Sequence, residues 1–225
     1  MTVKELYYKG LDKLNKLVSN NQQDVPYHIF TQNWNEQQLH WVSNCYKLDE
    51  KNKSEIHKIQ QLLLPHIIVS DKSEKQYYTE FDFPKNYFKY SSSYTNINKC
   101  PYKLENHLIE SHNNNLLKDP DWSPSLKFEE TLIQISNNKF LVYFNNEFKP
   151  ETLELSYYRF PNEIQIEDGH TDFNGNQTKD IMTEWTGDNL EEILDLTVES
   201  IASNYSDEYR RQTITNHIQQ TQIRI

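Results

Sequence analysis

The sequence predicts an α+β protein in which a helical bundle carries a small antiparallel β-sheet. Apolar residues recur every three to four positions over about 2–18, 33–64 and 188–220, and they alternate with polar residues over 131–160. The first period is that of a helix with one buried face, and the second is that of a strand. The bundle is expected to contain an N-terminal helix, a helical hairpin and C-terminal helices.

The N-terminal helix begins with the sequence T-V-K-E, in which Thr2 and Glu5 have the spacing of a capping box. Four apolar residues follow at helical spacing: Leu6, Leu14, Leu17 and Val18. Two further helices are expected within 33–64, the second capped by Ser54 and ended by Pro65. The short charged connection at 47–53 predicts that these two helices form an antiparallel hairpin.

The strands of the small sheet are expected in the second half of the chain. Residues 131–135 and 139–144 flank the turn formers Asn137 and Asn138, which predicts a β-hairpin. A third strand follows at 153–160 and ends at Pro161. Residues 91–126 contain three X-Pro pairs and runs of Ser and Asn, so they are expected to form a long loop. Such loops are usually functional, and we expect a docking arm here.

The strongest helix signal lies near the C-terminus. Asp188 caps the helix and Glu191 and Glu192 lie in its first turn, where the helix dipole favours acidic residues. An apolar stripe follows at helical spacing: Leu190, Ile193, Leu194, Val198 and Ile201. We expect this stripe to pack on the hairpin at 33–64. A last helix is expected over about 206–220, and its thin apolar face indicates that it needs a partner.

Two regions are expected from these elements. Residues 1–70 together with 188–225 should form the helical core, and residues 71–187 should hold the β-hairpin and the loop region.

The composition is poor in core-forming residues for a chain of 225 residues. Only 36% are hydrophobic, against about 45–50% in ordinary globular domains, and aromatic side chains supply much of what can be buried. This fits either an ordinary domain with a tyrosine-rich core or a chain that completes its burial against other subunits. The net charge of −10, with scattered basic residues, disfavours direct binding to nucleic acid. The same net charge is compatible with an acidic surface past which DNA slides without binding.

Targeting and redox signals are few. The two cysteines, Cys45 and Cys100, give no disulfide framework, which favours a reducing compartment. The N-terminal residues contain no apolar segment of the signal-peptide kind, and the longest apolar runs are too short to span a bilayer. No membrane partner is therefore expected.

Residue clusters that could bind a metal depart from known patterns. His170 and Asp172 lie in the oxygen-rich segment 168–176, but its glycine is two places early for an EF-hand loop, so a polar turn is the better interpretation. His107 and His112 are five apart, whereas an H-E-x-x-H zinc site needs four. We expect no metal site and no cofactor.

Enzyme motifs are also missing from the sequence. Cys45 lies near His40, but its place on the apolar side of a helix favours a buried, inert thiol over a nucleophile. Phosphate-binding loops and the G-x-S-x-G motif are absent, and the chain has only 4 glycines. An enzyme is the least favoured class, although an acidic site of unpatterned type stays open.

Two motifs suggest a family. The strand ending in Y-R-F-P-N-E-I, from Tyr158 to Ile164, is followed by the helix motif E-I-L-D-L-T-V at 192–198. With the ending S-D-E-Y-R-R-Q, this order of parts resembles the ring, or head-to-tail connector, proteins of crAss-like tailed bacteriophages. The resemblance is sharpest over 153–212.

The resemblance implies a function without catalysis. It implies a virion structural protein made in the host bacterial cytoplasm, forming a ring of about twelve copies in the phage neck or tail. The ring would contact the portal and other neck and tail rings, and genomic DNA would pass through its lumen without specific binding. The rival interpretations are a non-viral helical adaptor or regulatory protein and a small enzyme. The interface candidates are the stripe residues named above together with Tyr157, Tyr158, Arg159, Tyr94, Tyr102 and Trp122.

Overall fold

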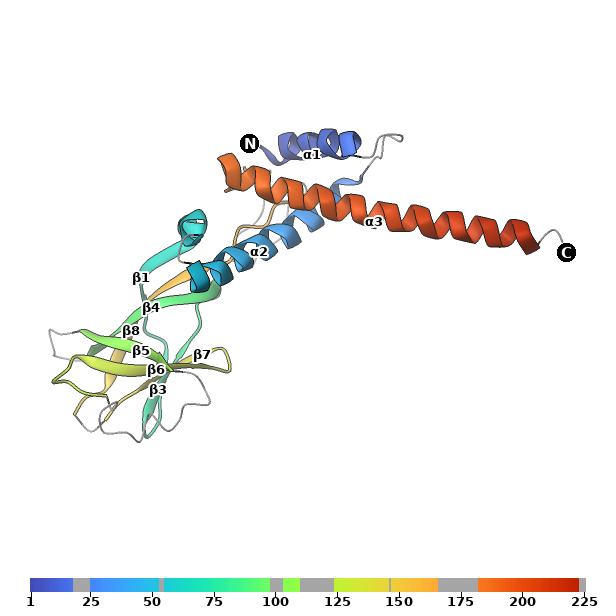
Figure 1. Ribbon diagram of the computed structural model, residues 1–225. Helices are drawn as coiled ribbons and strands as arrows, with labels where there is room; N and C mark the ends of the chain where they lie inside the picture. The colour runs from blue at the N-terminus through green and yellow to red at the C-terminus, as the bar shows by residue number, and fades with distance from the viewer. Residues whose placement is uncertain are drawn as a thin grey trace. The chain divides into compact units, whose positions relative to one another are not determined.

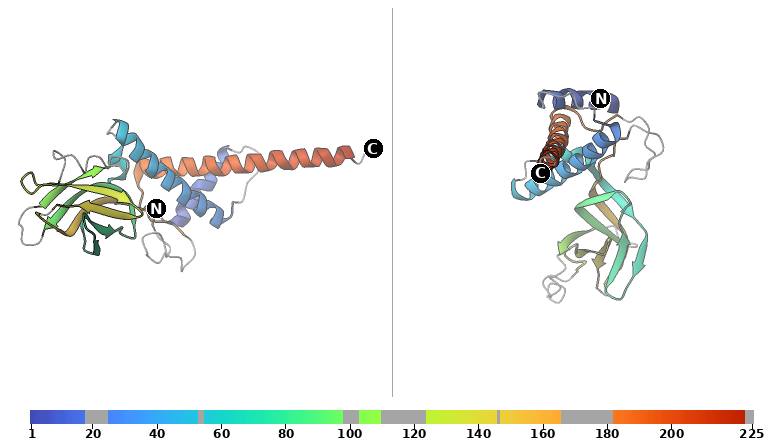
Figure 2. Two further views of the ribbon diagram at one scale, coloured as in Figure 1. Left: turned by 90° about the horizontal axis from the view of Figure 1, so that it is seen from below. Right: turned by 90° about the vertical axis from the view of Figure 1, so that its right-hand side faces the viewer.

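The computed structural model describes residues 1–17, 25–52, 55–97, 103–109, 124–145, 147–165 and 182–222. It divides into two compact units, which are described separately (Figures 1 and 2). A helical unit combines Met1–Gln60 with Pro161–Ile225, and a sheet unit comprises Gln61–Phe160.

Among its described residues, the helical unit has three α-helices, α1 (Val3–Leu17), α2 (Tyr27–Asn52) and α3 (Gly187–Gln222). The predicted capping box at its N-terminus is confirmed. The backbone N–H of Thr2 donates to Glu5 Oε2 at 2.9 Å, and the backbone N–H of Glu5 donates to Thr2 Oγ1 at 3.2 Å. A 3₁₀-helix, η1 (Ile56–Leu62), follows α2 in the sequence.

Both α1 and α2 pack against α3. The closest approach is at Gly10 of α1, where an added Cβ would lie 2.5 Å from Cε2 of Phe30 and 3.4 Å from Cδ1 of Leu194. Phe30 and Leu194 are buried, so neither has room to retreat. A side chain at position 10 would therefore push α1 away from its neighbours.

The sheet unit contains one mixed sheet of eight strands. They are β1 (Leu63–Val69), β2 (Lys72–Glu74), β3 (Tyr78–Asp82), β4 (Tyr87–Ile97), β5 (Lys103–Ile109), β6 (Glu130–Ser136), β7 (Lys139–Tyr143) and β8 (Pro150–Arg159). Their order is β1-β8-β4-β5-β6-β7-β3-β2. The pair β5–β6 is parallel, and the other pairs are antiparallel.

The sheet curls into a half-barrel because its two edge strands are consecutive in the sequence. Only Ser70 and Asp71 separate β1 from β2, so the opposite edges must come close together. The Lys72 ammonium of β2 donates to the backbone carbonyl of Pro150, at the start of β8, at 3.0 Å. The inside of the curl holds the core: Phe81, Ile133, Phe140, Val142, Leu153, Leu155 and Tyr157.

Strand β8 is buried on both faces from Leu153 to Tyr158. Glu154 points away from the leucines beside it and lies only 7% exposed. Its carboxylate is 2.5 Å from Lys103 Nζ and 2.6 Å from His66 Nδ1. The hydrogen bond from Lys103 holds the pKa of Glu154 below its usual range against the opposing effect of burial.

The predicted fold class, a helical bundle with a small antiparallel sheet, is wrong. The sheet is large and mixed, and the described residues of 33–64 contain no hairpin of two α-helices. There α2 is followed by η1 and then by β1, whose β-branched Ile67, Ile68 and Val69 pair with β8. Pro65 does not end a helix but lies on an edge strand, where its missing N–H is tolerated. The two C-terminal helices are one, α3.

The sheet was underestimated because polar residues line part of its interior. Residues 91–97 and 103–109, expected as loop, belong to β4 and β5. Besides Leu104 and Ile109, the buried side chains there are the polar Ser93, Thr95 and Asn106, which bond to one another at 2.7 Å. Because hydroxyl and amide groups take several of the buried positions, the strands lack the regular apolar alternation that marks a strand in the sequence.

The packing at Gly10 predicts the effect of one added methyl group. Gly10→Ala gains helix propensity of up to about 1 kcal/mol, but the overlap with Phe30 should cost about 1–3 kcal/mol. We expect a net loss in the free energy of unfolding, measured by urea denaturation. In a Phe30→Leu background, Gly10→Ala should lower the free energy of unfolding by less than it does in the native background. If Gly10→Ala costs the same free energy of unfolding in the native and the Phe30→Leu backgrounds, the phenyl ring of Phe30 is not what excludes a side chain at position 10.

Candidate functional site

The first half of α3 forms the centre of the helical unit. Leu190, at 4% exposed, is the most accessible of its predicted stripe residues. The five side chains, Leu190, Ile193, Leu194, Val198 and Ile201, are buried where α3 packs with α1 and α2. They are therefore already covered inside one copy of the chain.

Acidic residues fix the rotation of α3 on both sides of this stripe. On the α1 side, Glu191 pairs with Lys9 and Lys13, and hydrogen bonds from these lysines hold the pKa of Glu191 below its usual range. Lys13 also lies 2.5 Å from the Asp195 carboxylate. Each such half-exposed pair contributes at most about 1 kcal/mol, but together they select one face of α3 for α1.

The opposite side is held through Glu192. Its carboxylate accepts a hydrogen bond from Trp41 Nε1 of α2 at 2.8 Å and another from Lys58 Nζ at 3.1 Å. Burial works to raise the pKa of Glu192, but these two donors outweigh it, so the net pKa lies below the usual range. The neighbouring acids Glu191 and Glu192 thus tie α3 to different partners.

The second half of α3 continues without the other two helices. Ile201 is the last buried residue among the side chains that the structure describes, while the helix runs on to Gln222. In Figures 1 and 2 this half extends beyond α1 and α2. We call residues 205–222 the projecting half. Three of the chain's four arginines, Arg210, Arg211 and Arg224, lie in its last 16 residues, and the first two lie in the projecting half.

A network of amide side chains joins α2 to the extended segment 161–165. Asn35 Nδ2 donates to the carbonyl of Ile164 at 3.0 Å, and Asn35 Oδ1 accepts from the backbone N–H of Ile164 at 2.9 Å. Gln38, 1% exposed, donates to the carbonyl of Asn162 at 3.1 Å and accepts from Trp185 Nε1 at 3.0 Å. The segment is therefore held along α2 through its backbone.

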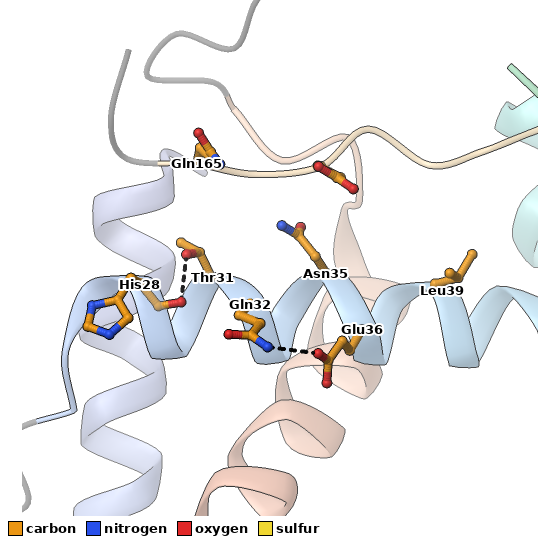
Figure 3. Close-up of a pocket in the computed structure, with 8 residues that line it drawn as sticks. His28, Thr31, Gln32, Asn35, Glu36, Leu39 and Gln165 are labelled. Atoms are coloured by element: carbon orange, nitrogen blue, oxygen red, sulfur yellow. Dashed lines mark hydrogen bonds between the residues drawn. The ribbon is translucent and has the colours of Figure 1, made fainter. Parts of the chain in front are cut away.

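Beside this network lies an open pocket of about 400 Å³ (Figure 3). Successive turns of α2 supply one row of side chains with His28, Gln32 and Glu36, and a second row with Thr31, Asn35 and Leu39. Glu163 and Gln165 line it from the extended segment. Gln32 Nε2 donates to Glu36 Oε1 at 3.1 Å. We call this the α2 pocket; its lining contains two carboxylates and no lysine or arginine.

The remaining interface candidates lie in the sheet unit or outside the described residues. Tyr157 and Tyr158 are buried in β8, and the Tyr157 hydroxyl donates to Asn86 Oδ1 at 2.6 Å. Arg159 Nη1 donates to the carbonyl of Phe160 at 2.9 Å. Tyr94 is half-buried in β4. Tyr102 and Trp122 lie outside the described residues.

The candidate chemical groups can be placed in part. Burial raises the pKa of the Cys45 thiol to about 11, so this thiol is protonated at neutral pH. His107 Nε2 lies 3.6 Å from a Glu130 carboxylate oxygen. The segment 168–176 and His112 lie outside the described residues. Within the described ranges, no group of three or more His, Cys, Asp or Glu residues is placed to hold a metal ion.

Comparison of the sequence with protein families and with curated proteins found no match. In the part of the chain that the structure describes, no helix has the length and apolar character needed to cross a membrane.

Neither the amide network nor the α2 pocket has a motif in the sequence. The one available signal was Gln38, which lies one turn after Trp34 on the apolar face of α2. A polar residue in such a position usually bonds to a specific partner. The partners, at 162–164 and Trp185, are more than 120 positions away, so spacing could not reveal them.

The buried amide of Gln38 gives the next prediction. Gln38→Leu leaves the Trp185 N–H and the Asn162 carbonyl without this partner, at about 1–3 kcal/mol for each group left unsatisfied. Chemical denaturation should show a lower free energy of unfolding. Gln32→Leu on the same helix is the matched control and should change it by less than about 0.5 kcal/mol, because Gln32 is exposed. Equal effects of the two substitutions would mean that the network does not stabilise the fold.

Proposed function

We propose that this chain is a structural subunit of a closed homo-oligomer, and that the oligomer is a head-to-tail connector ring in the neck or tail of a tailed bacteriophage. The observation that carries the proposal is the projecting half of α3. A helix that extends past its own core presents a surface that another chain can cover.

The energetics of helices support this step. A helix in water is marginally stable alone, and most helical stability in proteins comes from packing of an apolar face. The first half of α3 has such packing against α1 and α2. The projecting half is polar, with Tyr205, Tyr209, Ile214 and Ile218 as its apolar residues. We infer that it becomes packed in an assembly.

The choice of a connector ring rests on the sequence resemblance. The Y-R-F-P-N-E-I motif covers the end of β8 and the segment that α2 holds through Asn35 and Gln38. The E-I-L-D-L-T-V motif covers the turns of α3 that pack in the helical unit. Both motifs therefore lie at positions where the structure is tightly constrained. The net charge of −10 favours a passage to which DNA does not adhere.

Removing the projecting half tests the proposal. A variant ending at Asn204 keeps the packed part of α3, so its melting temperature should match that of the full chain. In sedimentation velocity from the micromolar to the millimolar range, the full chain should associate as concentration rises, and the shortened variant should stay monomeric.

A second variant separates the helix from mere chain length. Replacing 206–222 by a glycine–serine segment of equal length should abolish association as truncation does, because such a segment is a flexible coil. A full chain that stays monomeric throughout, or a shortened chain that still associates, would contradict the proposal.

A further inference from the structure

The two edges of the sheet differ in the side chains that they expose. At one edge lies β2, whose three residues, Lys72, Ser73 and Glu74, are all exposed. Charged side chains on an edge strand protect it from pairing with another chain. At the other edge lies β1, in which Ile67 is 37% exposed and Ile68 is 64% exposed. The stretch 67–69 of β1 carries neither a charge nor a proline, so it lacks the protection that β2 has.

The two exposed isoleucines lie on opposite faces of the sheet. Ile67 pairs with Leu155, which belongs to the core, and Ile68 pairs with Glu154, which points away from the core. Successive side chains of a strand point to opposite faces, so each face has one exposed isoleucine beside the free side of β1. Among the described strands, none pairs with that side. The edge therefore combines unpaired backbone with apolar side chains on both faces.

A β-bulge fixes the place where this stretch begins. The register between β1 and β8 shifts between Leu64 and Ile67, and His66 has a φ of 56°. The backbone N–H of His66 donates to Ser156 Oγ at 3.2 Å, and His66 Nδ1 lies 2.6 Å from the buried Glu154 carboxylate. A non-glycine residue with positive φ persists where its surroundings determine it. These contacts hold the edge in one conformation, which lowers the entropy lost on binding.

We propose that the free side of β1 receives an extended strand of another protein, with two successive apolar residues opposite Ile67 and Ile68. Unpaired backbone groups at a sheet edge are satisfied by the backbone of an added strand, the binding mode called β-augmentation. Cross-strand neighbours of an isoleucine stabilise the pair best when they are β-branched or aromatic.

The charges at the edge define the same partner. The stretch 67–69 is uncharged, and the nearby Glu154 carboxylate is already paired with Lys103 and His66. A charged residue opposite this stretch would lose hydration without gaining an ion pair, so the complementary residues are uncharged. The contact does not involve α3 and therefore goes beyond the proposed function.

A strand peptide tests the edge in the full chain. The probe is a fluorescein-labelled peptide with the β8 sequence of 150–159 and the change Glu154→Val, because β8 already pairs with both isoleucines from the other side. Its fluorescence anisotropy should rise and saturate as the full chain is added. Ile68→Lys in the full chain should weaken binding about tenfold or more, because the burial of an isoleucine side chain is lost. Since Ile68 is mostly exposed, this variant should keep the native melting temperature.

Two controls show whether strand pairing is what the anisotropy measures. Leu108→Lys makes the same charge change at a half-exposed leucine of β5, which has a strand on each side, and should leave binding unchanged. The same peptide N-methylated at every amide from 153 to 157 lacks the donors that a β-ladder needs and should not bind.

Several results would overturn the inference. The first is the absence of saturable binding up to about 1 mM protein. Equal binding to the native chain and to Ile68→Lys, or equal binding of the N-methylated peptide, would also overturn it. If the peptide does not bind and Ile68→Lys abolishes self-association of the chain, the occupant is a second copy and the inference fails. The proposed function is tested separately, because it depends on the projecting half of α3.

Discussion

The burial of one face of α3 is the constraint on which the helical unit depends. Leu194, at the middle of that face, lies close to the position that a side chain on Gly10 would occupy, and Phe30 closes the same space from α2. This geometry demands glycine in α1 and leaves no room for slippage. The acidic residues on either flank then select which helix meets which side. Hydrophobic burial supplies the stability, and the half-exposed ion pairs supply the orientation.

A different constraint shapes the sheet unit. Two residues connect β1 to β2, although these strands form opposite edges, so the sheet cannot stay flat. Curling creates an interior. Aromatic and aliphatic side chains fill one part of it, and hydroxyl and amide groups fill another part. Because Ser93, Thr95 and Asn106 satisfy one another, the polar part is compatible with burial.

The sequence predicted well what depends on local chemistry. The capping box at Thr2 and Glu5, the turn at Asn137–Asn138 and the start of α3 were all recognisable from neighbouring residues. The extent of the sheet was not, because β4 and β5 carry polar residues inward and β1 contains Pro65. The α2 pocket combines two segments that are distant in the sequence, so no spacing rule could find it.

The central claim is that copies of this chain assemble into a closed ring. Native mass spectrometry of the full chain, at concentrations where it associates, tests that claim most directly. The account predicts one dominant oligomer of fixed size, with about twelve copies if the resemblance to connector rings holds. A symmetric dimer that adds no further copies, or an open series of all lengths without a preferred size, would contradict it.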